Sequence, residues 1–185
     1  YSKAVTEGSN AGGAGGFDSA DDADASWTGA ALKFPRIQGA DACGRIVAVG
    51  EGVSSDRIGQ RVIVRNLLRT HVGWKPFECW TFGSECDGGF AQFAVAPSRE
   101  TFAVTCDWSD AELAAIPCAW STAENMLHRG RVGAETVLIT GASGGVGSSA
   151  VQLAKLRGAT VIALAGKGKA AEVMALGADR VVDRD

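Results

Sequence analysis

The stretch that decides the fold is residues 137–147, which read Val137-Leu138-Ile139-Thr140-Gly141-Ala142-Ser143-Gly144-Gly145-Val146-Gly147. It begins with a short apolar run rich in β-branched residues, which is typical of a strand buried on both faces of a parallel sheet. After the glycine-rich turn, apolar residues recur at helical spacing, at Val146, Ala150, Leu153 and Ala154. The sequence therefore predicts a strand, a tight turn and a helix in succession.

The glycines of this turn predict a binding site for phosphate groups. Gly144 and Gly145 carry no Cβ, so the backbone there can approach a diphosphate closely. Gly147 allows the helix to pack tightly against the strand. The free N–H groups and the positive dipole end of the helix would then face the anion. The candidate cofactor-binding residues of the turn are Gly141, Ala142, Ser143, Gly144, Gly145, Val146 and Gly147.

The turn belongs to a longer alternation of strands and helices. Strands are expected at 136–140, 159–165 and 180–183, with helices between them at 144–157 and 168–176. This βαβαβ order is half of a doubly wound sheet, so the predicted fold class is α/β. Half a sheet exposes one edge, and the chain begins at Tyr1 rather than at a methionine. We therefore expect the sequence to be a piece of a longer protein.

The preceding part of the chain follows a different pattern. Residues 1–31 are rich in Gly and Asp and lack apolar periodicity, which is typical of a loop or insertion, with an acidic metal-binding loop as the alternative. Over residues 32–117, short β-branched segments separated by glycine turns predict a mostly antiparallel barrel. The expected strands are 45–50, 62–64, 90–96 and 101–104, with an irregular loop at 65–87.

Two helices are expected between the barrel and the glycine turn. Ser109 and Glu112 form a capping-box pattern that opens a helix ending before Pro117. A second helix spans about 121–128, with Ala123, Met126 and Leu127 on its buried side. The predicted organisation is therefore a loop over 1–31, part of a barrel domain over 32–117, and half of a nucleotide-binding domain over 118–185.

Composition excludes several classes of function. The net charge is −3 and the 18 basic residues are scattered, which argues against a nucleic-acid surface. No apolar run approaches the roughly 20 residues of a membrane span, so the expected partner is a small-molecule substrate. The five cysteines include no C-x-x-C pair, which favours a reducing, cytoplasmic location over a disulfide framework. His71, Cys79 and Cys86 match no common zinc spacing.

Several of these segments together resemble the medium-chain dehydrogenase/reductase family. Residues 34–52 are similar to its P-x-x-x-G-(H/A/S)-(E/D)-x-x-G-x-V-x-x-V-G segment, residues 116–122 to its C-x-x-S-T segment, and residues 140–147 to its A-S-G-G-V-G turn. With residues 88–93, the likeness is closest to the branch between zinc alcohol dehydrogenases and quinone oxidoreductases. It implies a GroES-like catalytic domain followed by a Rossmann dinucleotide-binding domain, of which this chain would hold the first half.

The resemblance also implies roles for individual residues. Zinc-dependent members have a histidine ligand where this chain has Ala40, and Cys118 occupies the position of another zinc ligand. One cysteine does not make the three-ligand site of a catalytic zinc, so no metal is expected. The neighbouring Asp41 is a candidate for positioning substrate or relaying a proton, with a turn cap as the alternative. Thr122 matches a residue that packs beside the nicotinamide ring, and a helix N-cap hydroxyl is its structural alternative.

The choice of cofactor is argued from the end of the strand that follows the turn. An NAD-selective site needs a carboxylate there, about 20 residues past the glycines, to accept hydrogen bonds from the ribose 2′-OH. Residues 164–169 contain no acid, whereas Lys167 and Lys169 could pair with a 2′-phosphate. Loop lysines are often only solvated, which is the alternative for both. NADP(H) is therefore favoured over NAD(H).

These expectations combine into a zinc-independent, NADPH-dependent oxidoreductase that transfers hydride to an enone, a quinone or a carbonyl compound. The alternatives are a zinc alcohol dehydrogenase with ligands outside this sequence and a non-catalytic NADPH-binding protein. Residues 1–185 alone are expected to be inactive, because the resemblance implies that parts of the active site lie elsewhere. Relatives commonly dimerise through the last strand of the nucleotide sheet, so the full-length protein is a candidate homo-oligomer.

Overall fold

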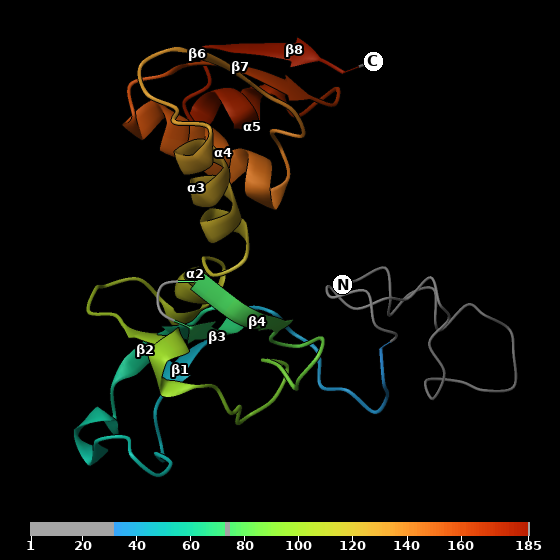
Figure 1. Cartoon of the computed structure of the whole chain (residues 1–185). Helices are drawn as coiled ribbons and strands as arrows, with labels where there is room; N and C mark the ends of the chain where they lie inside the picture. Colours follow the sequence, from blue (N-terminus) through green and yellow to red (C-terminus); the bar gives the residue numbers. More distant parts are fainter. Residues whose placement is uncertain (1–31, 73–74, 185) are drawn as a thin grey trace, which may run out of the picture. The chain divides into compact units, whose positions relative to one another are not determined.

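The computed structural model describes residues 32–72 and 75–184, so the loop predicted over 1–31 lies outside the described residues. The chain divides into two compact units, one ending at Pro117 and the other beginning at Cys118. In Figure 1 the described part of the first unit runs from blue to yellow-green and the second from yellow to red. Within the described ranges, no helix has both the length and the apolar character needed to cross a membrane.

A small antiparallel sheet organises the first unit. Its strands lie in the order β1 (Cys43–Arg45), β2 (Arg61–Val64) and β5 (Thr101–Ala103), and Val62 of β2 pairs with Gly44 on one side and with Ala103 on the other. Short 3-10 turns at Ser55–Arg57 and Ser98–Glu100 precede β2 and β5. The antiparallel expectation is confirmed. The strand predicted at 45–50 lies earlier in the chain, because β1 ends at Arg45. Backbone hydrogen bonds to the segment that precedes β2 continue only as far as Ile46.

The segment predicted as an irregular loop contains a β-hairpin, so that prediction was wrong. β3 (Leu67–Val72) pairs antiparallel with β4 (Lys75–Thr81), with a register shift between Thr70 and His71. Charged residues interrupt the apolar alternation of both strands, which hid the pattern in the sequence. Cross-strand backbone hydrogen bonds hold the hairpin, and the buried Leu68 of β3 packs in one cluster with Phe82 and Val64.

The strand predicted over 90–96 is absent, although its sequence alternates as a strand should. This segment forms bends, and Phe90, Phe93 and Val95 are 81%, 73% and 92% exposed. A strand needs a neighbour to satisfy its backbone N–H and C=O groups. Within the described residues the segment has no such neighbour beyond the hydrogen bond from the Phe90 N–H to the Gln38 carbonyl.

The helix predicted from the capping box is present as α2 (Asp110–Ala114). The Ser109 side chain accepts from the Glu112 N–H, and the Glu112 carboxylate accepts from the Ser109 N–H at 2.7 Å. The second helix is α3 (Ala119–Arg129), in which Ala123 and Leu127 are buried as expected. Met126 is 61% exposed, so its predicted burial was wrong.

The second unit has the βαβαβ order predicted from the sequence. Its parallel sheet follows the order β6 (Thr136–Ile139), β7 (Thr160–Ala165) and β8 (Arg180–Asp183), and the connecting helices are α4 (Gly145–Leu156) and α5 (Ala170–Ala175). This confirms the first half of a doubly wound sheet. The helices lie against one face of the sheet (Figure 1).

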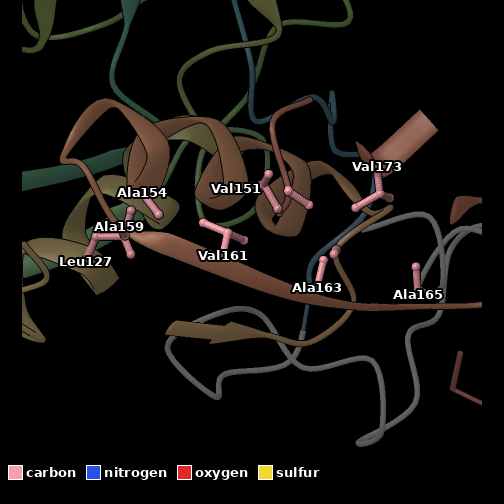
Figure 2. Close-up of a cluster of buried hydrophobic side chains, with 10 residues drawn as sticks. Leu127, Val151, Ala154, Ala159, Val161, Ala163, Ala165 and Val173 are labelled. Carbon is pink, nitrogen blue, oxygen red and sulfur yellow. The ribbon is translucent and has the colours of Figure 1, made fainter. Parts of the chain in front are cut away.

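Small side chains let these helices approach the sheet closely. In Figure 2, Val151 and Ala154 of α4 lie over Val161 and Ala163 of β7, and all four are completely buried. The other face of the sheet is less covered, and Leu138 of β6 is 64% exposed. The expectation that this strand is buried on both faces is therefore not met, because no described helix covers its second face.

An ion pair and a backbone hydrogen bond fasten α4 and β8 to β7. The Asp179 carboxylate accepts from Lys155 Nζ at 2.8 Å and from the Val161 N–H at 2.6 Å. The hydrogen bond from Lys155 has the larger effect and that from Val161 the smaller, and both lower the pKa of Asp179 below its ordinary value. Such a group stabilises the fold above its unfolded pKa of about 3.9, and this contribution disappears as the pH falls through the lower folded pKa.

Asp179→Asn is therefore expected to lower the urea midpoint of unfolding at neutral pH and to differ less from the wild type at about pH 2.5. Asp107→Asn is the control, because Asp107 is exposed and has no ion-pair partner among the described residues. The control midpoint should match the wild type at both pH values. An Asp179→Asn effect of equal size in acid would contradict the assignment.

Candidate functional site

The loop between β6 and α4 presents an uncapped helix start. Gly141 has a φ of +60°, a left-handed conformation that favours glycine, and the Gly144 N–H donates to the Gly141 carbonyl at 2.9 Å. Gly144 is the N-cap of α4 and supplies no capping side chain. The first N–H groups of α4 therefore have no side-chain acceptor, while Gly141, Ser143, Gly144 and Gly145 are exposed around them.

The glycines of the loop have distinct structural roles. Gly147 is buried, and a Cβ there would lie 2.2 Å from the Gly141 carbonyl oxygen, closer than atoms can pack. At Gly145 a Cβ would meet only Ala119 of α3, at an ordinary 3.5 Å. Gly147 therefore permits the approach of helix and loop, whereas Gly144 and Gly145 leave the outer surface of the loop open.

Two further residues of the loop lie inward. Ala142 is completely buried, and its N–H donates to the Leu164 carbonyl of β7 at 3.1 Å. Val146 is half-buried on α4. The Ala142 side chain is therefore not exposed to a ligand, and this residue shapes the loop through its backbone.

A cavity of about 540 Å³ extends from this loop along β6. Its lining is apolar except for backbone groups and Thr140, and no charged side chain contributes to it. Among the described strands β6 pairs only with β7, so its other edge is open beside the cavity. The lining residues are Met126, Leu127, Val132, Val137, Leu138, Ile139, Thr140, Gly141, Gly144, Gly145, Val146, Gly147 and Ala150.

Two lysines follow the carboxyl end of β7, but they are not equivalent. The Lys169 ammonium is held by the Glu172 carboxylate at 3.1 Å, an exposed ion pair. Lys167 is exposed and has no ion-pair partner among the residues that the structure describes. Of the two predicted phosphate contacts, Lys167 is therefore the cation that remains available.

The neighbouring strand adds charged residues that the sequence argument overlooked. Asp183 of β8 pairs in register with Ala165, and the Arg184 N–H donates to the Ala165 carbonyl at 3.0 Å. The end of β7 contains no acid of its own, yet the sheet places an acid and a guanidinium next to it. The βαβαβ order could have revealed them, because the carboxyl ends of parallel strands share one edge of the sheet.

Thr122 and Cys118 lie in the first turns of α3. The Thr122 hydroxyl is exposed and donates to the Cys118 carbonyl one turn earlier, at 2.7 Å. The N-cap position belongs to Cys118, so the alternative role of Thr122 as an N-cap hydroxyl was wrong. The Cys118 side chain is half-buried.

Asp41 belongs to the other unit, where glycines crowd the backbone around it. A Cβ on Gly83 or Gly88 would lie 2.6 or 2.3 Å from the Gly39 carbonyl oxygen, and one on Gly89 would lie 2.7 Å from the Asp41 carbonyl oxygen. The half-buried Asp41 and the buried Ala40 are thus held by close backbone packing.

Of the three residues considered for zinc, Cys79 and Cys86 are described by the structure, whereas the side chain of His71 lies outside the described part. No group of three His, Cys, Asp or Glu side chains able to hold a metal ion occurs among the described residues. Cys86 donates its thiol to the Thr81 carbonyl at 3.8 Å, and burial raises its pKa. Cys79 is half-buried in β4.

Comparison with known proteins identifies the family. The family described as "Alcohol dehydrogenase GroES-like domain" matches residues 14–105. The chloroplast envelope quinone oxidoreductase homolog of Arabidopsis thaliana is 37% identical over 158 residues, covering 82% of this chain and 43% of that protein. The structure of a putative alcohol dehydrogenase from Sinorhizobium meliloti 1021 is 49% identical with a TM-score of 0.77. The match covers 83% of this chain and 43% of that structure's chain.

Two other similar structures have ligands bound. The rspB dehydrogenase of Escherichia coli CFT073, complexed with NADH, is 28% identical with a TM-score of 0.76, covering 83% of this chain and 48% of its own. A cobalt- and zinc-bound alcohol dehydrogenase from Pyrobaculum aerophilum is 32% identical with a TM-score of 0.71. The match covers 81% of this chain and 49% of that structure's chain. The chain belongs to the medium-chain dehydrogenase/reductase family, and it spans less than half the length of these relatives.

Replacing Gly147 by alanine tests the packing of the loop in the full-length protein. Gly147→Ala is expected to cost about 1–3 kcal/mol of stability, because the new Cβ forces the Gly141 carbonyl away. Dinucleotide affinity should fall with it. Gly50→Ala is the control, since a Cβ at Gly50 meets no atom within 4 Å. Urea unfolding and fluorescence titration measure both effects, and wild-type values for Gly147→Ala would contradict the assigned role.

Proposed function

We propose that the full-length protein is an NADPH-dependent oxidoreductase that transfers hydride to a quinone, an enone or a carbonyl compound without catalytic zinc. The observation that carries the proposal is the start of α4, whose N-cap Gly144 supplies no capping side chain. The close approach of Gly147 to Gly141 places this helix start directly after the glycine loop. Free N–H groups at a helix start, reached across side-chain-free glycines, suit the diphosphate of a dinucleotide. The family and its named oxidoreductases agree with this class of reaction.

The residues of this chain have separate tasks in that reaction. The loop of residues 141–147, which forms part of the cavity lining, would hold the diphosphate. The nicotinamide would supply the hydride. Thr122 is proposed to pack beside the ring, with its hydroxyl oriented by the Cys118 carbonyl. Asp41, which belongs to the first unit, is proposed to position substrate or relay a proton.

The preference for NADPH is supported by the charges after β7. Lys167 is available to a 2′-phosphate, and residues 164–169 contain no carboxylate that would repel one. Lys169 would contribute less, because Glu172 already neutralises it. Asp183 on β8 acts against the preference, because a carboxylate repels a phosphate.

The absence of catalytic zinc is proposed from the donor positions. Ala40 is apolar and buried where zinc-dependent members carry a histidine, which leaves Cys118 as the single matching donor in this sequence. Charge developing on the substrate oxygen would then be stabilised by hydrogen-bond donors in a site from which water is excluded. We further propose a cytosolic location, since the five cysteines are free thiols, which a reducing compartment preserves.

Titration of the full-length protein with NADPH and NADH tests the cofactor assignment. A charge-assisted hydrogen bond contributes about 1.5–3 kcal/mol, and about 1.4 kcal/mol is tenfold in affinity. NADPH is therefore expected to bind at least about tenfold more tightly than NADH. Equal affinities, or a preference for NADH, would refute the NADPH assignment.

Metal analysis tests the zinc-free proposal and its main alternative. Purified full-length protein is expected to contain zinc well below one equivalent and to keep its NADPH oxidation activity after treatment with a chelator. Stoichiometric zinc together with loss of activity on chelation would instead establish a zinc alcohol dehydrogenase. A protein that binds NADPH but reduces no compound in a panel of enones, quinones and aldehydes would be a non-catalytic binding protein.

A further inference from the structure

Helices α3 and α4 are joined by a close contact at one end of α4 and by an ion pair at the other. A Cβ on Gly145, the first residue of α4, would lie 3.5 Å from the Ala119 Cβ of α3. At the far end of α4, Arg157 Nη2 donates to Glu124 Oε1 of α3 at 2.5 Å. Arg157 Nη1 also donates to the Leu153 carbonyl of α4 at 3.2 Å. The guanidinium therefore bridges the two helices.

We infer that Arg157, through its ion pair with Glu124, is a positioning residue that aligns the nicotinamide ring for hydride transfer. It does so by fixing where α3 presents Thr122 relative to the glycine loop that opens α4. This inference rests on the proposed function, because Thr122 and that loop are the proposed contacts of the nicotinamide and the diphosphate. Arg157 itself touches neither the cofactor nor the substrate and acts through α3.

The position of Glu124 on α3 determines the position of Thr122. The two residues are two apart on one helix, which is about 3 Å along the axis. The Thr122 hydroxyl donates to the Cys118 carbonyl at 2.7 Å, so it is oriented by the same helix. A rotation or a slide of α3 against α4 would therefore move this hydroxyl relative to the glycine loop.

The apolar part of the contact between α3 and the rest of the unit is less specific about such movements. Figure 2 shows Leu127 of α3 close to Ala154 and Ala159, and these three residues belong to one buried cluster. Hydrophobic contacts are non-directional, so they hold α3 in place without strongly fixing its rotation. A hydrogen bond between charged groups has a preferred direction and distance, so the bond from Arg157 to Glu124 supplies that restraint.

The exposure of the ion pair separates its effect on stability from its effect on rate. The side chains of Arg157 and Glu124 are 23% and 51% exposed, and exposed ion pairs contribute little to the stability of a protein. Hydride transfer is more sensitive, because a small misplacement of reacting groups lowers the rate strongly. Loss of the pair should therefore slow the reaction without unfolding the protein or weakening diphosphate binding.

The test uses the full-length protein and the substrate that it reduces fastest among enones, quinones and aldehydes. The variants are Arg157→Met, Glu124→Gln and the charge-swapped double variant Glu124→Arg/Arg157→Glu. Arg129→Met is the matched control, because Arg129 is an exposed arginine at the end of α3 without an ion-pair partner among the described residues. Turnover gives kcat, and NADPH deuterated at the transferred position gives the isotope effect. Calorimetry with ADP-ribose 2′-phosphate, which lacks the nicotinamide, measures binding of the diphosphate part alone.

Arg157→Met and Glu124→Gln are each expected to lower kcat by about threefold or more and to raise the isotope effect, because hydride transfer becomes slower relative to the other steps. The affinity for ADP-ribose 2′-phosphate should stay within about twofold of the wild type, and the urea midpoint should hardly change. The double variant should recover part of the lost rate. High salt should reduce the difference between Arg157→Met and the wild type, since it screens exposed charges. Arg129→Met should match the wild type throughout.

Four results would overturn the inference. Unchanged kcat and isotope effect in Arg157→Met, beside an active wild type, would refute the role of Arg157 and leave the proposed function standing. Parallel losses of kcat, nucleotide affinity and urea midpoint would show that the pair only supports the fold. A double variant as slow as the two single changes combined would show that the ion pair is not the cause. A wild type that transfers no hydride to any compound of the panel would refute the proposed function and this inference with it.

Discussion

The close contact between Gly147 and Gly141 is the constraint on which the second unit depends. A single methyl group at Gly147 would lie 2.2 Å from the Gly141 carbonyl oxygen. Because that methyl is absent, α4 begins immediately behind the loop, and its first N–H groups stay open to a ligand instead of being capped by a side chain. The same loop is fixed to the sheet by the bond from Ala142 to Leu164. Backbone packing thus both builds the fold and leaves exposed the N–H groups that we propose as the anion site.

The core repeats this use of small side chains. Alanines of α4 and β7 allow helix and sheet to approach, and Val151, Val161 and Val173 fill the space between them (Figure 2). Protein interiors are close-packed, so a site that depends on a tight helix–sheet distance needs residues of small volume beneath it. The first unit uses glycine for another purpose, since Gly83 and Gly88 let two backbone segments cross at Gly39 beside Asp41.

The chemistry of the candidate site is gathered by the parallel sheet. Parallel strands end at one edge, so groups distant in sequence become neighbours there. Lys167 follows β7, Asp183 ends β8 and Arg184 follows it, so the charge at this edge of the sheet is the sum of all three. The end of β7 and the loop after it contain no acid and two lysines. The assembled edge contains one carboxylate, one available lysine and a guanidinium.

The sequence by itself determined the βαβαβ order, the glycine loop and the capping box of α2, because each depends on short-range patterns: apolar periodicity, φ preference and side chain-to-backbone bonding. It misjudged the β3–β4 hairpin and the segment over 90–96, because a strand exists only where a neighbour accepts its hydrogen bonds. Lys169 and Glu172 are only three residues apart, so their ion pair is local, whereas tertiary structure alone decided that the Arg184 guanidinium lies beside Gly166. The register of β7 and β8 sets that second contact, and it joins residues 18 apart in the chain, beyond the reach of any local pattern.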